Sequence, residues 1–213
     1  MSLLYREKSI FIHHLFKSGM VLAIVIALFL SEAGMSRSIQ LMKENVLLLN
    51  SGLTDAQEAE LKIVLWFERG KPAENLLADL PADGWEWQEA QLGIGENNAY
   101  TLAGRKSINA QEEKSIYPWF AKLSQEVQEL GGIAYLDERV PEGIDIAKFS
   151  IEQEINPVQW SFTESTISVA GLKSGFYPAV QSGDEAVNIQ LISQAHDGQG
   201  RTALAIPVLL EEF

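Results

Sequence analysis

The apolar residues in the first third of the chain predict a strand followed by a helix. Glu44–Asn50 (ENVLLLN) is a short apolar run, which is typical of a buried strand. Thr54 and Gln57 have the spacing of a capping box, so we expect a helix from there to about Arg69. Its apolar face would be formed by Ala56, Ala59, Ile63, Trp66 and Phe67.

A hairpin is predicted after this helix. Residues 85–92 and 98–106 have the pattern of two strands, and the glycine-containing segment 93–97 would join them. A helical turn or two is expected at 73–80, before a turn at 81–84. The first strand, the helix and the hairpin would then form a subdomain of residues 42–106.

A second helix is predicted after another capping signature at Asn109–Glu112. Proline is tolerated in a first helical turn but not in an interior, so Pro118 places the start of the main helix near Tyr117, after a looser turn. Gly131 and Gly132 would end it. Its apolar face would hold Ile116, Trp119, Phe120, Leu123, Val127 and Leu130.

Strands dominate the pattern of the C-terminal part. Residues 133–140, 165–172, 187–195 and 202–210 predict strands, whereas 144–154, which Pro157 closes, fits helix and strand equally. Pro207 indicates that the last strand lies at a sheet edge or is bulged. The order of elements predicts an α+β fold, with antiparallel sheet and helices packed on one face. Residues 107–213 would form a second subdomain, and the two subdomains could be related halves.

The first 33 residues have the pattern of an export segment. Three basic residues precede Gly19–Leu30, an uncharged run of 12 residues, which is the length of a signal-peptide apolar region, while a spanning helix needs about 20. Ser31 and Ala33 have the spacing of a signal-peptidase site, which favours cleavage after Ala33. The alternatives are an uncleaved anchor that borrows Ile10–Phe16, and a buried core helix. We therefore expect residues 1–33 to be a signal peptide or an N-terminal membrane anchor, and residues 34–213 to work outside the cytoplasm.

Charge and cysteine content narrow the classes of function. Beyond Ala33 the chain carries 13 basic and 27 acidic side chains, a balance that repels phosphate backbones. The basic residues are scattered along the sequence, so nucleic-acid binding is not expected. The chain has no cysteine, so the exported domain depends on its core instead of disulfides. A lipid-modified cysteine after the apolar run is likewise excluded.

Several short segments of the C-terminal part carry a family resemblance: Ser165–Gly171 (STISVAG), Val187–Leu191 (VNIQL), Gly200–Thr202 (GRT), Ile206–Val208 (IPV) and Glu211–Phe213 (EEF). The last four resemble the closing hairpin of the YwmB family, and the first is similar to the family's preceding segment. The family has been labelled TATA-box binding, because its fold resembles that of the TATA-binding protein. The resemblance implies that fold, and an exported protein of a Gram-positive spore former that works in the envelope or in sporulation. The family has no established activity and no known catalytic residues, so the resemblance implies none here.

Signatures of the common catalytic classes are missing from the sequence. His196 is the one histidine beyond the export segment, and a lone histidine cannot start a tetrahedral zinc site, so we expect an exposed turn residue. The sequence has no cysteine nucleophile, no G-x-S-x-G elbow and no S-x-x-K. Gly93–Gly95 lacks the third glycine of a dinucleotide fingerprint. Asp184–Glu185 could touch calcium, but no EF-hand loop surrounds it. We expect no cofactor and no metal.

Two further sets of residues are candidates for a site. A glycosidase needs two carboxyl groups about 5–9.5 Å apart, although abundant acid on such a chain is mainly a solvated surface. The carboxylates considered are Glu86, Glu89, Asp137 and Glu138. Trp85 and Trp87 lie on one face of a predicted strand and could stack on a sugar ring, while packing against a helix is the commoner use of such a pair.

We therefore expect a non-enzymatic, exported binding domain whose partner is a protein or an envelope component. The alternative is an envelope hydrolase with paired carboxylates, one of them with a raised pKa. DNA binding, which the family label suggests, is opposed by the charge and by export. Membrane contact would occur through residues 1–33, if these are not removed.

Overall fold

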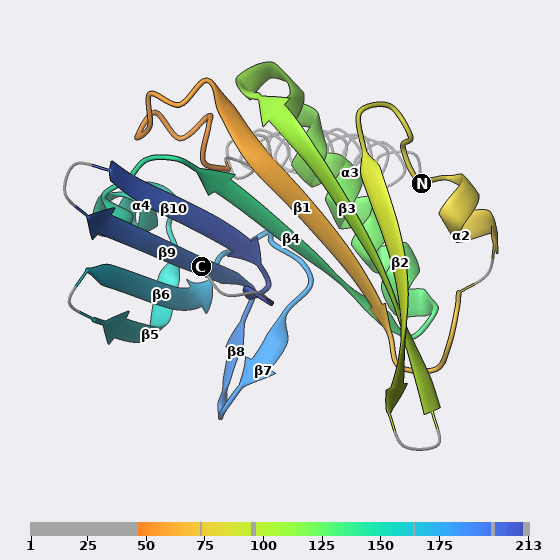
Figure 1. Ribbon diagram of the computed structural model, residues 1–213. Coiled ribbons are helices and arrows are strands. Elements are labelled where there is room, and N and C mark those ends of the chain that lie inside the picture. Colours follow the sequence, from red (N-terminus) through yellow and green to blue (C-terminus); the bar gives the residue numbers. More distant parts are fainter. Residues whose placement is uncertain (1–46, 73, 95–96, 164, 197–198, 211–213) are drawn as a thin grey trace, which may run out of the picture. The chain divides into compact units, whose positions relative to one another are not determined.

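Antiparallel β-structure dominates the computed structural model, which describes residues 47–72, 74–94, 97–163, 165–196 and 199–210. Eight strands form one sheet in the order β2-β3-β1-β4-β10-β9-β6-β5, and β7 pairs with β8 in a small hairpin (Figure 1). This confirms the predicted α+β class with an antiparallel sheet, while the predicted export segment 1–33 lies outside the described residues. The elements are β1 (Glu58–Phe67), α2 (Glu74–Ala78), β2 (Glu86–Ile94), β3 (Asn97–Asn109), α3 (Ala110–Glu129), β4 (Gly132–Val140), α4 (Ile146–Glu152), β5 (Asn156–Phe162), β6 (Thr166–Leu172), β7 (Val180–Ser182), β8 (Glu185–Val187), β9 (Ile189–His196) and β10 (Gln199–Ile206).

The helix predicted from Thr54 to Arg69 is wrong, because residues 58–67 form the central strand β1. Every second side chain of β1 enters the core, and the strand pairs with β3 on one side and with β4 on the other. The capping residues serve a turn instead: Thr54 Oγ1 accepts a hydrogen bond from Ala56 N at 3.1 Å and donates one to Glu142 at 2.6 Å. The inward side chains of β1 are Ala59, Leu61, Ile63, Leu65 and Phe67.

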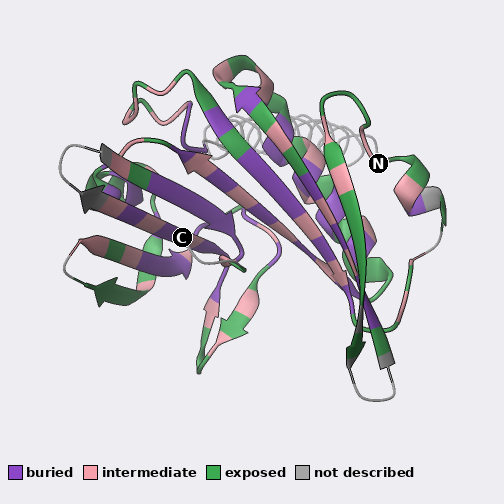
Figure 2. Ribbon diagram, viewed as in Figure 1, coloured by how far each residue is buried: buried purple, intermediate pink, exposed green. Residues whose placement is uncertain are grey.

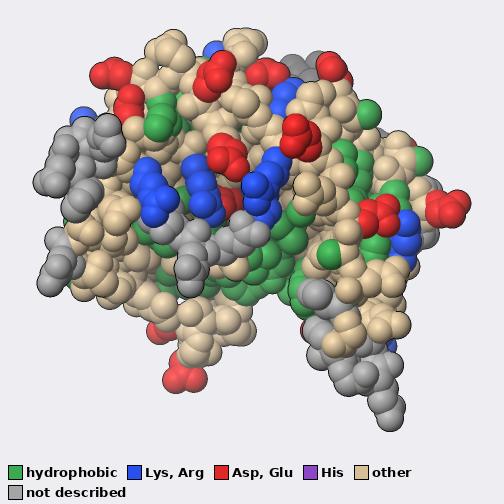
Figure 3. All heavy atoms as spheres, viewed as in Figure 1, with side chains coloured by type: hydrophobic (Ala, Val, Ile, Leu, Met, Phe, Trp, Pro, Cys, Tyr) green, Lys and Arg blue, Asp and Glu red, His purple; other side chains and the backbone are tan. Residues whose placement is uncertain are grey.

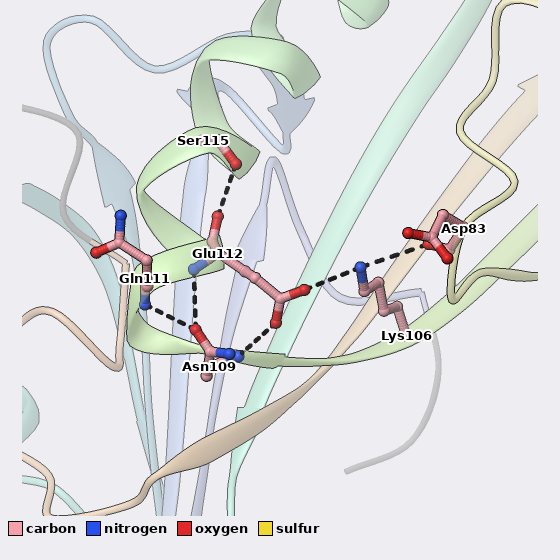
Figure 4. Close-up of polar contacts among 6 residues, drawn as sticks. All are labelled: Asp83, Lys106, Asn109, Gln111, Glu112 and Ser115. Atoms are coloured by element: carbon pink, nitrogen blue, oxygen red, sulfur yellow. Dashed lines mark hydrogen bonds and ion pairs between the residues drawn. The ribbon is translucent and has the colours of Figure 1, made fainter.

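Helix α3 starts at the capping box that the sequence predicts. The Asn109 side chain accepts hydrogen bonds from the N–H groups of Gln111 and Glu112, at 2.9 and 3.0 Å, and Glu112 accepts one from Asn109 N at 3.1 Å (Figure 4). Lys106 of β3 lies 3.0 Å from the Glu112 carboxylate, so an ion pair ties the start of the helix to the sheet.

Pro118 does not delay the helix to Tyr117 as predicted, because α3 runs through it. A proline in a helix interior removes the hydrogen bond to the carbonyl four residues earlier. Here that carbonyl belongs to Lys114, and both Lys114 and Pro118 are exposed, so water can replace the missing donor. Gly131, with a φ of 76°, follows the end of the helix as predicted.

The core lies between the helices and one face of the sheet. Along β4, every second residue from Gly132 to Val140 is buried, and the residues between them are half-buried, so the two faces of the sheet differ (Figure 2). Helices α3 and α4 lie behind the sheet in the view of Figure 1 and leave its other face open. The α3 side chains that enter the core are Ile116, Tyr117, Phe120, Leu123 and Val127.

The strand predicted at 44–50 is wrong, although its burial is confirmed. Leu47, Leu48 and Leu49 are 0%, 0% and 7% exposed, but Leu47–Asn50 forms a turn and joins no sheet, and residues 44–46 lie outside the described part. A buried segment outside a sheet must find other acceptors for its backbone N–H groups. Those acceptors are the side chains of Glu113 and Glu138.

Two predictions for the C-terminal part need correction. Strand β10 is not an edge strand but lies between β4 and β9, and it ends at Ile206, so Pro207 follows the strand and does not interrupt it. The sheet gains an edge strand, β5, that the sequence did not indicate. Pro157 fits near its start, because an edge strand needs N–H donors on one side alone. The undecided segment 144–154 contains α4.

We expect Gly104→Ala to destabilise the protein, because Trp87 lies against the backbone of Gly104. A Cβ atom at residue 104 would lie 2.5 Å from the Trp87 ring, and such overpacking costs about 1–3 kcal/mol of unfolding free energy. Gly93→Ala in the neighbouring strand is the matched control, since its nearest neighbour would be 3.9 Å away. Equal denaturant midpoints for the two variants would contradict this packing.

Candidate functional site

The open face of the sheet gathers side chains that the sequence scatters. Because side chains alternate along a strand, the residues between the core positions of β1 and β4 all point to this face. Lys62 lies opposite Arg105 of β3 and Asp137 of β4, and Glu60 lies opposite Arg139. Figure 3 shows Lys and Arg side chains in a row across this face, with acidic side chains beside them.

Acidic partners balance these cations. Arg139 donates from Nε and Nη2 to the same oxygen of Asp137, at 2.9 and 2.6 Å. Burial raises the pKa of Asp137, and the hydrogen bond and charge of Arg139 oppose that rise. Glu86 of β2 lies opposite Arg105. The open face is therefore close to neutral, on a chain whose net charge is −13.

An open groove of about 950 Å³ lies at one end of this face, where β1 and β10 begin and where β3, β4 and β9 end. Its polar lining consists of Glu58, Glu60, Ser107, Arg139, Gln194 and Arg201. Ligand sites of proteins commonly measure about 300–1,000 Å³ and hold a few convergent polar groups. The groove has the size and the mixed charge to hold a ligand that carries both an anionic and a cationic group.

The neighbouring part of the open face is apolar. Val64 lies opposite Tyr135, and Trp66 lies opposite Ile133, and all four are half-buried. Green side chains lie below the basic row in Figure 3. The segment after β10 reaches this region: Val208 and Leu210 line a small cavity together with Val64 and Tyr135, and Leu209 N donates to Gln190 at 2.9 Å.

The sequence-predicted aromatic pair, Trp85 and Trp87, lies elsewhere. The two rings stack at 5.2 Å with an interplanar angle of 16°, and Trp85 also contacts Trp119 of α3 at 5.6 Å. Trp87 Nε1 donates to the Pro81 carbonyl at 2.8 Å. Both tryptophans pack against the core and are half-buried. Their contact with a ligand stays a prediction, while the packing of Trp85 on α3 agrees with the commoner use of such a pair.

A buried pair of carboxyl groups joins α3 to β4. Glu113 is 2% exposed and Glu138 is 0% exposed. Leu48 N donates to Glu138 at 2.7 Å, and Leu49 N and Asn50 N donate to Glu113 at 2.6 and 3.1 Å. The Asn50 side chain also donates to Glu113. The pair thus accepts three consecutive backbone N–H groups of the buried turn Leu47–Asn50.

Burial changes the titration of Glu138. Desolvation raises the pKa of Glu138 well above its ordinary value of 4.5, and the charge of Glu113 adds to the rise. Glu138 Oε1 accepts no hydrogen bond, so a protonated Glu138 can donate from this oxygen toward Glu113. A proton on Glu138 keeps the negative charge of that group out of the core.

Glu138 is among the carboxylates that the sequence offers as candidates, whereas Glu113 is not. The sequence does contain a signal that both acids are buried. Glu113 lies three residues before Ile116 and seven before Phe120, on the apolar face of α3. Glu138 alternates with the apolar residues Leu136 and Val140. An acid on an apolar face indicates a buried partner. Neither spacing indicates that these two acids meet each other.

The other sequence candidates lie in three other parts of the fold. Glu89 is exposed and lies 3.0 Å from Lys71, and Asp184 and Glu185 are exposed in the β7–β8 hairpin. His196 ends β9, and its side chain is outside the described part. Within the described ranges, no group of three or more acidic or histidine side chains could hold a metal ion. The helices in those ranges are too short or too polar to cross a membrane.

Comparison of the chain with protein-family models gives no match, and a comparison with curated protein sequences gives none either.

We expect Glu138→Gln to make stability less dependent on pH. A group whose pKa is raised by folding stabilises the protein below its unfolded pKa, near 4.5, and this contribution is lost as pH rises through the folded pKa. Glutamine keeps the shape of the neutral acid and cannot lose a proton. Above pH 4.5, the unfolding free energy of the wild type should fall relative to that of the variant, by up to about 1.4 kcal/mol per pH unit.

Glu113→Gln is the matched comparison in this experiment. Glu113 accepts hydrogen bonds from three donors. Glutamine would turn an N–H donor toward some of them, so we expect this variant to be destabilised. Denaturant titrations at a series of pH values measure both effects. Parallel pH profiles for Glu138→Gln and the wild type would contradict the buried, protonated state of Glu138.

Proposed function

We propose that this protein is a YwmB-type domain that works outside the cytoplasm as a non-enzymatic binding module, and that the open face of its sheet is the binding surface. The proposed location rests on the export pattern of residues 1–33, and the proposed family rests on the similarity of the C-terminal hairpin. The observation that carries the proposal is the open groove on the sheet, which has balanced charges and lies next to the apolar part of the open face. A fold like that of the TATA-binding protein would bind its ligand through the same face of its sheet.

The chemistry of this face favours a protein or peptide-like envelope component as the ligand. Glu58 and Glu60 can bind cationic groups, and Arg139 and Arg201 can bind carboxylates, all within one groove. Half-buried Trp66 and Tyr135 offer apolar and aromatic contact next to it. Polypeptides combine these three kinds of group.

The same chemistry opposes duplex DNA as the ligand. A protein gains affinity for DNA from cations that neutralise phosphates. On the open face, acidic side chains lie opposite or beside these cations, as Glu60 does for Arg139 and Glu86 for Arg105. A phosphate backbone would meet those carboxylates together with the cations.

The hydrolase alternative meets two of its three requirements. Glu113 and Glu138 are close together, and the pKa of Glu138 is raised, which is the arrangement of an acid and its partner. The third requirement is access to substrate, and Leu47–Asn50 covers both carboxyl groups. We therefore assign the pair to the architecture of the domain.

Site-specific photocross-linking in producing cells tests the binding surface. A photoreactive residue at Ser107, an exposed position that lines the groove, should cross-link to the ligand. The same residue at Ser115, exposed on the outer side of α3, is the control and should give no such product. Adding Arg201→Glu to the Ser107 probe should reduce the product, because the groove loses one of its two arginines.

Three results would contradict the proposal. They are a lack of cross-links from groove positions, equal products from Ser107 and Ser115, and a product that Arg201→Glu leaves unchanged. Salt-sensitive cross-linking of the groove probe to DNA would instead support the nucleic-acid alternative.

A further inference from the structure

The two edges of the sheet differ in a way that concerns association. An exposed edge strand offers free backbone groups to another chain, and proteins protect such edges with charged side chains. The edge strand β2 carries Glu86 and Glu89. The opposite edge strand β5 (NPVQWSF) and its neighbour β6 (TISVAGL) contain no charged residue.

The unprotected edge also exposes aromatic side chains. Trp160 is 44% exposed and Phe162 is 67% exposed, and their rings lie parallel, with centroids 5.9 Å apart and an interplanar angle of 4°. Ile167, opposite Phe162 on β6, is 40% exposed. These three residues form an apolar patch on a strongly acidic chain, and such patches mark interaction sites.

The backbone of β5 points its free groups outward beside this patch. Thr163 N donates to Thr166 O at 2.9 Å, and bonded residues alternate along an antiparallel ladder. Ser161 therefore also bonds toward β6, while the N–H and C=O groups of Trp160 and Phe162 point away from the sheet. The β7–β8 hairpin reaches β5 at Gln159, whose side chain donates to Ser182.

We propose that β5 pairs antiparallel with β5 of a second copy of this chain, about a twofold axis at Ser161. This register brings each Trp160 opposite Phe162 of the second copy, with the outward N–H and C=O groups of both residues facing each other. Antiparallel pairing of identical strands is self-complementary, as a twofold interface requires.

Self-complementarity of the uncharged strand β5 is the reason for choosing a second copy as the occupant, and charge restricts where two copies can meet. Two chains of net charge −13 repel each other over most of their surfaces. Association is then limited to a surface without charge, and β5 and β6 provide one. Two half-exposed aromatic side chains bury roughly 200 Å² of surface per copy. This is less than the area of about 800 Å² per partner that a standard interface buries. The dimer should therefore depend on protein concentration.

Disulfide trapping tests this register in the full chain, which has no cysteine of its own. In the proposed dimer the two Ser161 residues form a non-hydrogen-bonded pair with Cα atoms about 4.5 Å apart, which is within the range that a disulfide spans. Ser107→Cys is the matched control, because Ser107 is also an exposed strand serine and belongs to β3, away from β5. Under mild oxidation, Ser161→Cys should give at least about tenfold more linked dimer than Ser107→Cys, because pairing raises the effective concentration of the thiols.

A second substitution tests the aromatic contact. Phe162→Glu, added to Ser161→Cys, places a carboxylate on each copy against Trp160 of the other and should suppress the linked dimer several-fold. Ser161 and Phe162 are both exposed, and circular dichroism checks that the variants fold. The proposal is overturned if Ser161→Cys links no faster than Ser107→Cys, if Phe162→Glu leaves the yield unchanged, or if Ser161→Cys links to a different protein instead of to itself.

Discussion

The packing of α3 on the sheet depends on how the protein satisfies three buried backbone N–H groups. The turn Leu47–Asn50 enters the core outside any sheet, and leaving one such donor without an acceptor costs about 1–3 kcal/mol. Glu113 and Glu138 supply the acceptors, one from the helix and one from the sheet. Because each acid holds the same turn from a different element, the helix, the sheet and the turn are connected through one pair of carboxyl groups. The raised pKa of Glu138 limits the charge that this arrangement brings into the core.

Closing the core on one side of the sheet leaves the other face uncovered by the described helices (Figure 1). Along β1, Leu61 and Ile63 enter the core while Lys62 between them points to the open face. The same alternation in β4 sends Glu138 inward and Asp137 outward. Adjacent residues of one strand therefore serve different purposes: Glu138 accepts a hydrogen bond in the core, and Asp137 next to it pairs with Arg139 on the open face. The geometry separates two sets of carboxylates that look alike in the sequence.

The sequence predicts well those elements that depend on residues close together along the chain. Helix α3 and the strands β3, β4, β6 and β9 follow from apolar spacing and turn residues, and the α+β class follows from their order. Strand β1 was predicted as a helix because its residues Leu61–Phe67 (LKIVLWF) are apolar on nearly every side, and a continuous apolar run does not distinguish a central strand from a buried helix. The open face could not be predicted for the same reason, since its basic row exists only once residues 58–67 are a strand between β3 and β4. The contact between Glu113 and Glu138 depends on the packing of α3 on β4, which no spacing within either element encodes.

Net charge connects the groove on the sheet with the edge strand β5. On a chain of net charge −13, contacts with other molecules are favoured where acid is balanced, as in the groove, or absent, as on β5 and β6. A twofold axis perpendicular to the sheet keeps the open faces of two paired copies on the same side of one continuous sheet. Two grooves on one side could then bind neighbouring units of a single polymer or assembly, and weak binding by each groove would add up to tight attachment. A concentration-dependent dimer would restrict tight binding to places where the chain accumulates.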